Sequence, residues 1–213
     1  MPQTVLFCQF MHRTPIRLLF IPGGRTSIEL QGRGHFARND DIVFIYGPQY
    51  KYLPKWFIER DWKKEEIRVI KSKLFPTDFT DGIITHSVQN FDLKISSLER
   101  ALFELNYCIP ELITFEEAAY LYEGMLNLNP KLVQSLLENC NYIKVKRLFL
   151  YFAELKKLPC MDNISLKNVH LGSGKRVIVK NGKYDKKYKI TVPENIDQEE
   201  ETSEDYFDDD SDI

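Results

Sequence analysis

The hydrophobic pattern of this chain changes its period near residue 96, and that change limits the fold more than any other feature of the sequence. Between residues 23 and about 94, short β-type runs alternate with turn signals. From Ser96 onward, apolar residues recur at the i, i+3, i+4, i+7 spacing of amphipathic helices. After Pro159 the strand pattern returns. Strands at both ends of a helical middle segment predict an α+β fold rather than a repeated βαβ unit.

Three runs in the first region have strand character and are expected to form one small mixed β-sheet. Residues 41–46 are mostly β-branched or aromatic, residues 67–71 alternate apolar and charged side chains, and residues 82–86 follow a turn. Residues 26–31, and a short helix that begins at Pro54, are expected to cover this sheet.

The helical middle segment carries recognisable helix starts. The sequences S-S-L-E from Ser96 and T-F-E-E from Thr114 fit the capping box, and Asn129 is followed by a proline at the first helical position. A fourth helix is expected from about residue 144 to 155, with apolar side chains on two sides. Beyond it, runs at 177–179 and 188–192 predict a C-terminal β-hairpin, whose turn ends at Gly182 or as late as Lys187.

Charge is distributed unevenly along the chain. Residues 194–213 contain eleven acidic side chains and no basic ones, so residues 1–193 hold all 29 basic and 20 of the 31 acidic side chains, a net charge of +9. Within them, residues 144–189 contain thirteen basic and three acidic side chains. Such a segment indicates either a polyanionic partner or a solvated lysine-rich surface. The acidic tail is expected to be disordered and to compete with a polyanion for the basic segment.

Several classes of protein are excluded. No apolar run approaches the roughly 20 residues of a membrane-spanning helix, and the N-terminus lacks a secretory signal, so we expect a cytoplasmic protein without membrane contact. The four cysteines have no metal-site spacing and are expected to be reduced packing residues. Histidines and loop aspartates form no catalytic order. We therefore expect no metal, no cofactor and no enzymatic activity.

The start of the fourth helix is the first candidate binding element. It gathers Lys144, Lys146 and Arg147 in one turn, at the end of a helix where the macrodipole disfavours cations by about 0.3–1 kcal/mol each. A bound phosphate would relieve this cost, and so would a neighbouring Glu or Asp. The sequence is compatible with both interpretations.

The second candidate element is the loop L-G-S-G-K-R at residues 171–176. It lacks the first glycine and the hydroxyl residue of a Walker-type loop, so it does not predict nucleotide hydrolysis. It is either an anion-binding loop or a turn whose glycines supply positive φ. Together the two elements predict one basic face of Lys144, Lys146, Arg147, Lys175 and Arg176 that contacts nucleic-acid phosphate.

Six stretches in order give the chain a family resemblance. They are GGRTSIELQG at 23–32, LPKWF at 53–57, ERA to IP at 99–110, KVKRLFL at 144–150, LGSGKR at 171–176 and YKITVP at 188–193. In these stretches the chain resembles the AbiEi family, the antitoxin and transcriptional-regulator halves of type IV abortive-infection toxin–antitoxin systems. The resemblance covers residues 23–193 and is the basis for three divisions: a divergent segment 1–22, an AbiEi-like antitoxin domain 23–193 and the acidic tail 194–213.

The resemblance implies an antitoxin with DNA-binding autoregulation of its operon, and hence two partners: the DNA of its own promoter and a nucleotidyltransferase-like toxin. Family members typically carry a winged helix ahead of this domain, and the 22 residues before Gly23 are too few for one. Operator recognition by a winged helix is therefore not assigned to any residue here. The alternative functions are a nucleic-acid- or nucleotide-processing enzyme and a pure protein-interaction module.

Overall fold

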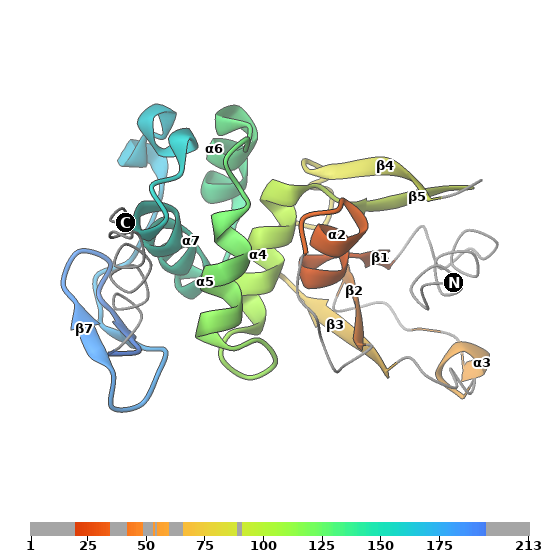
Figure 1. The fold of residues 1–213 in the computed structure, drawn as a ribbon, viewed down its shortest axis with the longest axis horizontal. Coiled ribbons are helices and arrows are strands. Elements are labelled where there is room, and N and C mark those ends of the chain that lie inside the picture. The colour runs from red at the N-terminus through yellow and green to blue at the C-terminus, as the bar shows by residue number, and fades with distance from the viewer. Residues whose placement is uncertain are drawn as a thin grey trace, which may run out of the picture.

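The computed structural model describes residues 20–34, 42–48, 53, 55–59, 66–88 and 91–194. Figure 1 shows an elongated body with helices in the middle and strands at both ends, the arrangement that the sequence predicts for an α+β chain. Almost all of the predicted segment 1–22 and of the acidic tail 194–213 lies outside the described residues.

The N-terminal sheet is mixed, as predicted, because β2 pairs antiparallel with one neighbour and parallel with the other. Its strands are β1 (Ile21–Pro22), β2 (Ile42–Pro48) and β3 (Glu66–Ser72). The parallel register places Ile42 opposite Glu66. Helix α2 (Gly24–Leu30) packs against β2, and the short helix α3 (Lys55–Ile58) forms where Pro54 predicts one.

The third predicted strand belongs to a separate sheet, which corrects the expectation of a single one. Strand β4 (Ile83–Val88) pairs antiparallel with β5 (Phe91–Ser96), and Ile84 lies opposite Ile95. Leu93 and Ile95 of β5 are buried while Asp92 and Lys94 are exposed, so β5 has the period-two pattern of a half-buried strand. Because β4 and β5 are adjacent in sequence, they pair as a hairpin, and Leu93 and Ile95 of this hairpin share one core cluster with Ile45 of the first sheet.

Four helices follow, and their starts agree with the local signals in the sequence. They are α4 (Leu98–Cys108), α5 (Phe115–Glu123), α6 (Pro130–Asn139) and α7 (Ile143–Leu155). The Thr114 hydroxyl accepts from the amide of Glu117, and the Asn129 side chain accepts from the amide of Lys131. At α4 the cap is Ser97, which accepts from the Arg100 amide, and not Ser96 as predicted.

Helix α7 is buried on more than one side, as its apolar spacing predicts. Val145, Leu148, Phe149, Leu150 and Phe152 are all fully buried. Phe149 stacks on Phe103 of α4 with ring centroids 4.7 Å apart, and Phe152 stacks on Tyr122 of α5 at 4.9 Å. Aromatic packing among α4, α5 and α7 therefore forms the centre of the main core.

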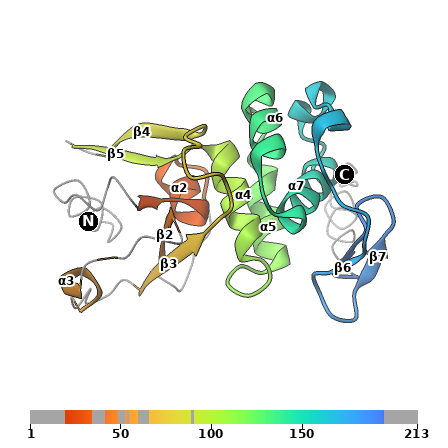
Figure 2. The same cartoon turned by 180° about the vertical axis from the view of Figure 1, so that it is seen from behind.

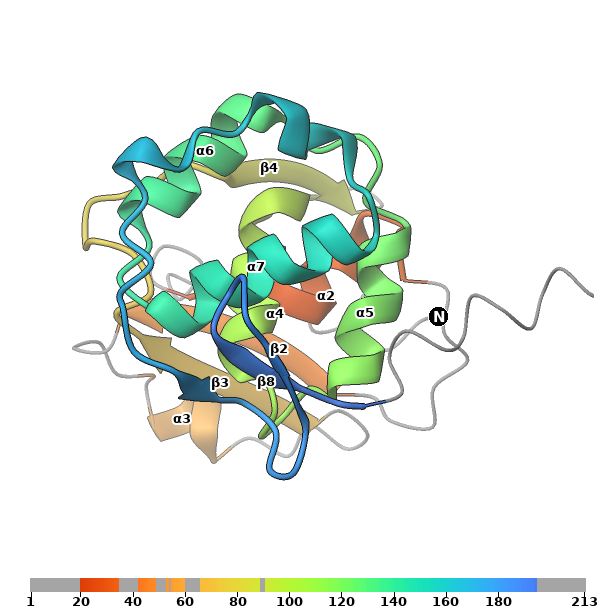
Figure 3. The same cartoon turned by 90° about the vertical axis from the view of Figure 1, so that its left-hand side faces the viewer.

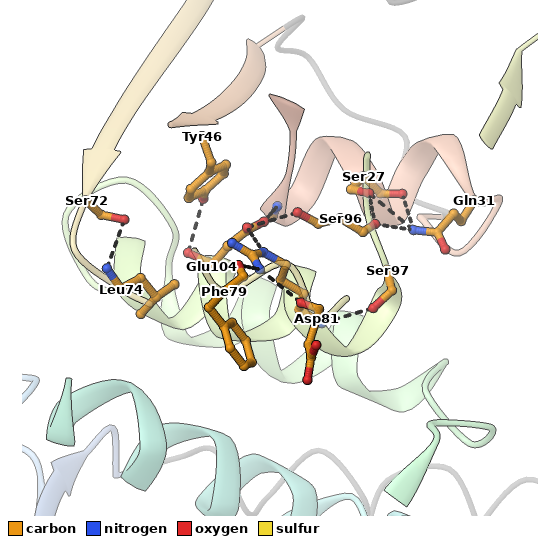
Figure 4. Close-up of polar contacts among 12 residues, drawn as sticks. Ser27, Gln31, Tyr46, Ser72, Leu74, Phe79, Asp81, Ser96, Ser97 and Glu104 are labelled. Carbon is orange, nitrogen blue, oxygen red and sulfur yellow. Dashed lines mark hydrogen bonds and ion pairs between the residues drawn. The ribbon is translucent and has the colours of Figure 1, made fainter. Parts of the chain in front are cut away.

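A buried carboxylate of α4 joins α2 and β5 to that helix. Glu104, 2% exposed, accepts from the Gly24 amide at 2.9 Å, the Ser96 hydroxyl at 2.9 Å and Arg100 Nε at 3.2 Å. The Tyr46 hydroxyl donates to the Glu104 carbonyl at 3.1 Å (Figure 4). Gly24 has φ +51°, and a Cβ there would lie 2.6 Å from the Tyr46 hydroxyl, so this approach requires glycine.

The C-terminal strands form the predicted hairpin, but with different strands and a later turn. After the 3-10 helices η2 (Pro159–Asn163) and η3 (Leu166–Asn168), β7 (Lys183–Asp185) pairs antiparallel with β8 (Ile190–Val192) around a turn at 186–189. Strand β6 (Arg176–Val177) pairs with the other edge of β8 and runs parallel to it, whereas the sequence predicts an antiparallel partner. Figure 2 shows β6 and β7 at this end of the molecule.

A side chain explains why the run 177–179 does not form the predicted hairpin strand. The Thr191 hydroxyl accepts from the Ile178 amide at 2.9 Å and donates to the Val179 carbonyl at 2.9 Å. These bonds replace the backbone ladder on that edge of β8. Asn181, at φ 58°, then turns the chain into β7, so the Asn-Gly turn exists but connects β6 to β7.

The cysteines of the described residues are reduced and buried, as predicted. Cys108, Cys140 and Cys160 are free thiols, 4%, 3% and 2% exposed, and Cys8 lies outside the described residues. Burial raises the pKa of Cys108 and of Cys140 to about 11, so both thiols are protonated and unreactive near neutral pH.

Candidate nucleic-acid interface

Arg147 is the most heavily hydrogen-bonded cation of the predicted basic face, and its partners are carbonyl oxygens of this chain. The side chain is 2% exposed. Its donors reach four backbone carbonyls, those of Leu171 at 2.8 Å, Gly172 at 3.0 Å, Gly174 at 2.7 Å and Lys189 at 3.1 Å. Arg147 therefore fastens the glycine loop and the start of β8 to α7. Figure 3, seen from the C-terminal end, shows β8 lying in front of α7.

The loop conformation depends on one of its two glycines. Gly172 has φ +67°, and a Cβ at this position would lie 2.8 Å from Ile143 Cδ1 at the start of α7. A side chain there would be strained in its backbone and would push the loop away from the helix. At Gly174 no atom lies within 4 Å of the Cβ position, so this glycine faces open space.

Lys144 and Lys146 also have protein-internal environments. Lys144 Nζ donates to the Ile109 carbonyl at 2.6 Å and to the Tyr107 carbonyl at 3.1 Å, at the C-terminal end of α4. Its ammonium thus lies at the negative end of the α4 dipole, which is a favourable place for a cation. Burial lowers the pKa of Lys144, and Glu111, 4.0 Å away, opposes that shift. Lys146 is 5% exposed, and burial lowers its pKa as well.

The structure therefore divides the five predicted cations into two groups. Lys146 and Arg147 are buried and Lys144 is 25% exposed. For Lys144 and Arg147, backbone carbonyl oxygens offset the cost of a cation at a helix start, a source that the sequence does not reveal. In this conformation Lys146 and Arg147 do not present their charges to a ligand. Lys175 and Arg176 are exposed directly beyond the loop that Arg147 holds.

The exposed pair belongs to a larger cluster, here called the C-terminal basic segment and defined as residues 175–189. All of its cations are exposed, and they are Lys175, Arg176, Lys180, Lys183, Lys186, Lys187 and Lys189. Asp185 is the one acidic residue in this stretch. Five of these lysines were not among the predicted site residues, although the excess of positive charge over residues 144–189 could have indicated them.

A family model matches this chain in sequence, and a solved structure matches it in fold. Residues 40–193, well over half of the chain, match the family model described as transcriptional regulator, AbiEi antitoxin, type IV TA system. The chain belongs to the AbiEi antitoxin family. The matched region of this AbiEi chain contains α4 to α7 and the C-terminal basic segment, while the resembling stretch at 23–32 lies outside it. The description of the AbiEi family fits the expectation of a regulator that is not an enzyme.

The fold of this AbiEi chain is similar to that of the RV2827C protein from Mycobacterium tuberculosis, known from a crystal structure. The similarity has a TM-score of 0.61 and 12% sequence identity, and it covers 89% of this chain and 67% of that one. No curated protein matches the chain. Over the described residues, no helix is long and apolar enough to span a membrane, and no group of three or more metal-binding side chains occurs.

Proposed function

We propose that this chain acts in the cytoplasm as the antitoxin of a type IV toxin–antitoxin system, and that it regulates its own operon by binding promoter DNA through the C-terminal basic segment. The observation that carries the DNA contact is the exposure of all seven cations of this segment, with a single acidic residue among them. Phosphate contacts by such cations release counterions from DNA, which supplies sequence-independent affinity. Membership of a family of transcriptional regulators supports DNA as the polyanion.

Within this proposal the five cations predicted from the sequence have two different roles. Lys175 and Arg176 contact the DNA backbone directly, since both are exposed. Arg147 acts as a positioning residue, because its bonds to the Gly172 and Gly174 carbonyls fix the loop that leads to Lys175. Lys144 keeps the start of α7 next to α4, and both Lys144 and the buried Lys146 contribute only long-range positive potential.

The DNA contact is tested by a salt titration. In the variant Lys175→Ala with Arg176→Ala, we expect the slope of log K against log salt to fall by about 1.8 in magnitude, about 0.9 for each lost contact with duplex DNA. The matched control is Lys73→Ala with Lys131→Ala, which removes two exposed cations elsewhere. Its slope should equal that of the parent protein. Equal slopes in all three proteins would exclude Lys175 and Arg176 from the interface.

The antitoxin activity is tested by growth in cells that express the nucleotidyltransferase-like toxin of the same locus. We expect the full chain to restore growth. The variant Arg147→Ala, in which the C-terminal sheet is no longer fastened to α7, should fail to do so at equal expression. Persistent growth arrest with the folded parent chain would contradict the proposal. Turnover of nucleotides or nucleic acid by the purified chain would favour an enzyme instead, and a stable toxin complex without DNA binding would favour a protein-interaction module.

A further inference from the structure

A groove of about 470 Å³ lies between the second half of α7 and the β7–β8 hairpin. Its apolar surface comes from Tyr151, Leu155, Tyr188 and Val192. Lys183, Lys186 and Lys187 of the hairpin also line it. Its volume falls within the range of ligand pockets, and its lining combines aromatic rings with cations. The groove therefore suits a ligand that is both aromatic and negatively charged.

The two carboxylates of the groove are bound by donors of the protein. Glu154 accepts from the Tyr188 hydroxyl at 2.5 Å and pairs with Lys187, and these two hydrogen bonds lower the pKa of Glu154. Asp185 accepts from the Tyr188 amide at 2.6 Å. Lys183 and Lys186 are exposed on the same hairpin, so the groove has an excess of positive charge.

A segment with the complementary chemistry follows the groove in the sequence. Val192 lines the groove, and the eleven acidic side chains of residues 194–213 begin two positions later. Tyr206 and Phe207 are the only aromatic residues of this segment, and acidic residues at 204–205 and 208–210 flank them directly. The 13 residues between Val192 and Tyr206 span at most about 45 Å when extended, which is ample to reach back, and such a tether gives a millimolar effective concentration.

We infer that the groove is the docking site of this chain's own residues 204–210. Tyr206 and Phe207 occupy the apolar surface at Tyr151 and Leu155, and the flanking carboxylates pair with Lys183 and Lys186. The aromatic contact makes the interaction more specific than general attraction between an acidic tail and a basic surface. Because Lys183 and Lys186 belong to the C-terminal basic segment, docking also blocks part of the DNA contact. That last consequence rests on the proposed function, whereas the docking itself does not.

The docking is tested by zero-length carbodiimide cross-linking of the full chain, which joins carboxylates to nearby amines, followed by peptide mass spectrometry. We expect cross-links from residues 204–210 to concentrate on Lys183 and Lys186, about fivefold above exposed lysines elsewhere such as Lys73 and Lys131. The variant Tyr206→Ser with Phe207→Ser keeps every charge and should lose most of this preference. An even spread over all exposed lysines, an unchanged preference in the variant, or cross-links found only in dimers would overturn the inference.

A DNA-binding measurement on the same proteins distinguishes a failure of this inference from a failure of the proposed function. If both hold, the same serine variant binds duplex DNA about threefold or more tightly than the parent at low salt, because the tail no longer competes. If neither protein binds DNA while the cross-links persist, the docking stands and the proposed DNA contact is wrong. If both proteins bind DNA equally and the cross-links show no preference, the DNA contact stands and the docking is wrong.

Discussion

Replacing Arg147 by alanine is expected to lower the free energy of unfolding by about 3–5 kcal/mol. The substitution removes the hydrogen bonds to the carbonyls of Leu171, Gly172 and Gly174 and one of the two to the carbonyl of Lys189, which also accepts from the Arg176 amide. It also leaves a cavity where a 2% exposed side chain was packed. A partly buried carbonyl that loses its donor is costly to the extent that water cannot replace the lost hydrogen bond. Urea denaturation followed by circular dichroism measures the change.

Two further variants make this prediction specific to the hydrogen bonds of Arg147. Arg147→Lys keeps the charge but offers one ammonium group, which cannot reach all four carbonyls, so we expect a loss of about 2 kcal/mol. Lys175→Ala removes a cation of the same loop at an exposed position and should change the stability by less than about 0.5 kcal/mol. An Arg147→Ala variant as stable as Lys175→Ala would show that the loop is held by other contacts.

Replacing Glu104 by alanine is expected to have the second largest effect, a loss of about 3–4 kcal/mol. The carboxylate is the common acceptor for the Gly24 amide, the Ser96 hydroxyl and Arg100 Nε. Its removal breaks all three of these hydrogen bonds. The loss should appear in denaturant unfolding as a lower midpoint with an unchanged slope. An unaltered midpoint would show that α2 and α4 are joined by apolar packing alone.

The protonation of Glu104 gives this prediction a pH dependence. Burial raises the pKa of Glu104, and the neighbouring Arg100 opposes that shift only in part. The folded chain therefore keeps this proton to a higher pH than the unfolded chain does, so the stability that Glu104 contributes falls as pH rises from its ordinary pKa through the raised one. Glu104→Gln lacks this titration, so the parent should lose more stability than the variant between pH 4.5 and pH 8. Parallel stability curves would contradict the raised pKa.

Features set by neighbouring residues were predictable from the sequence. The caps at Thr114 and Asn129 were predicted at the correct residues, because a cap satisfies backbone amides only two or three positions away. The cap of α4 was placed one residue early, at Ser96 instead of Ser97, because two serines in succession satisfy the same pattern. The Ser96 hydroxyl bonds to Glu104 instead, which no local rule indicates.

Features that depend on distant residues were not predictable in the same way. Which strands share a sheet depends on pairing across the chain, so β4 was assigned to the wrong sheet and β6 to the wrong direction of pairing. The role of Arg147 was missed for a related reason. Its acceptors are backbone carbonyls more than twenty residues away, and a backbone carbonyl leaves no mark on the sequence. Side-chain chemistry alone therefore suggested a phosphate or a neighbouring carboxylate as the acceptor, and neither of these is a backbone carbonyl.

The position of α4 has a consequence for how the chain loses its structure. This eleven-residue helix contacts α2 and β5 on the N-terminal side and α5, α6 and α7 on the other side, so both parts pack on the same short element. Neither part can separate from α4 without exposing apolar surface that the other part also uses. We therefore expect the strand-rich part and the helical part to unfold as one cooperative unit, so that destabilisation on either side of α4 lowers the stability of the whole.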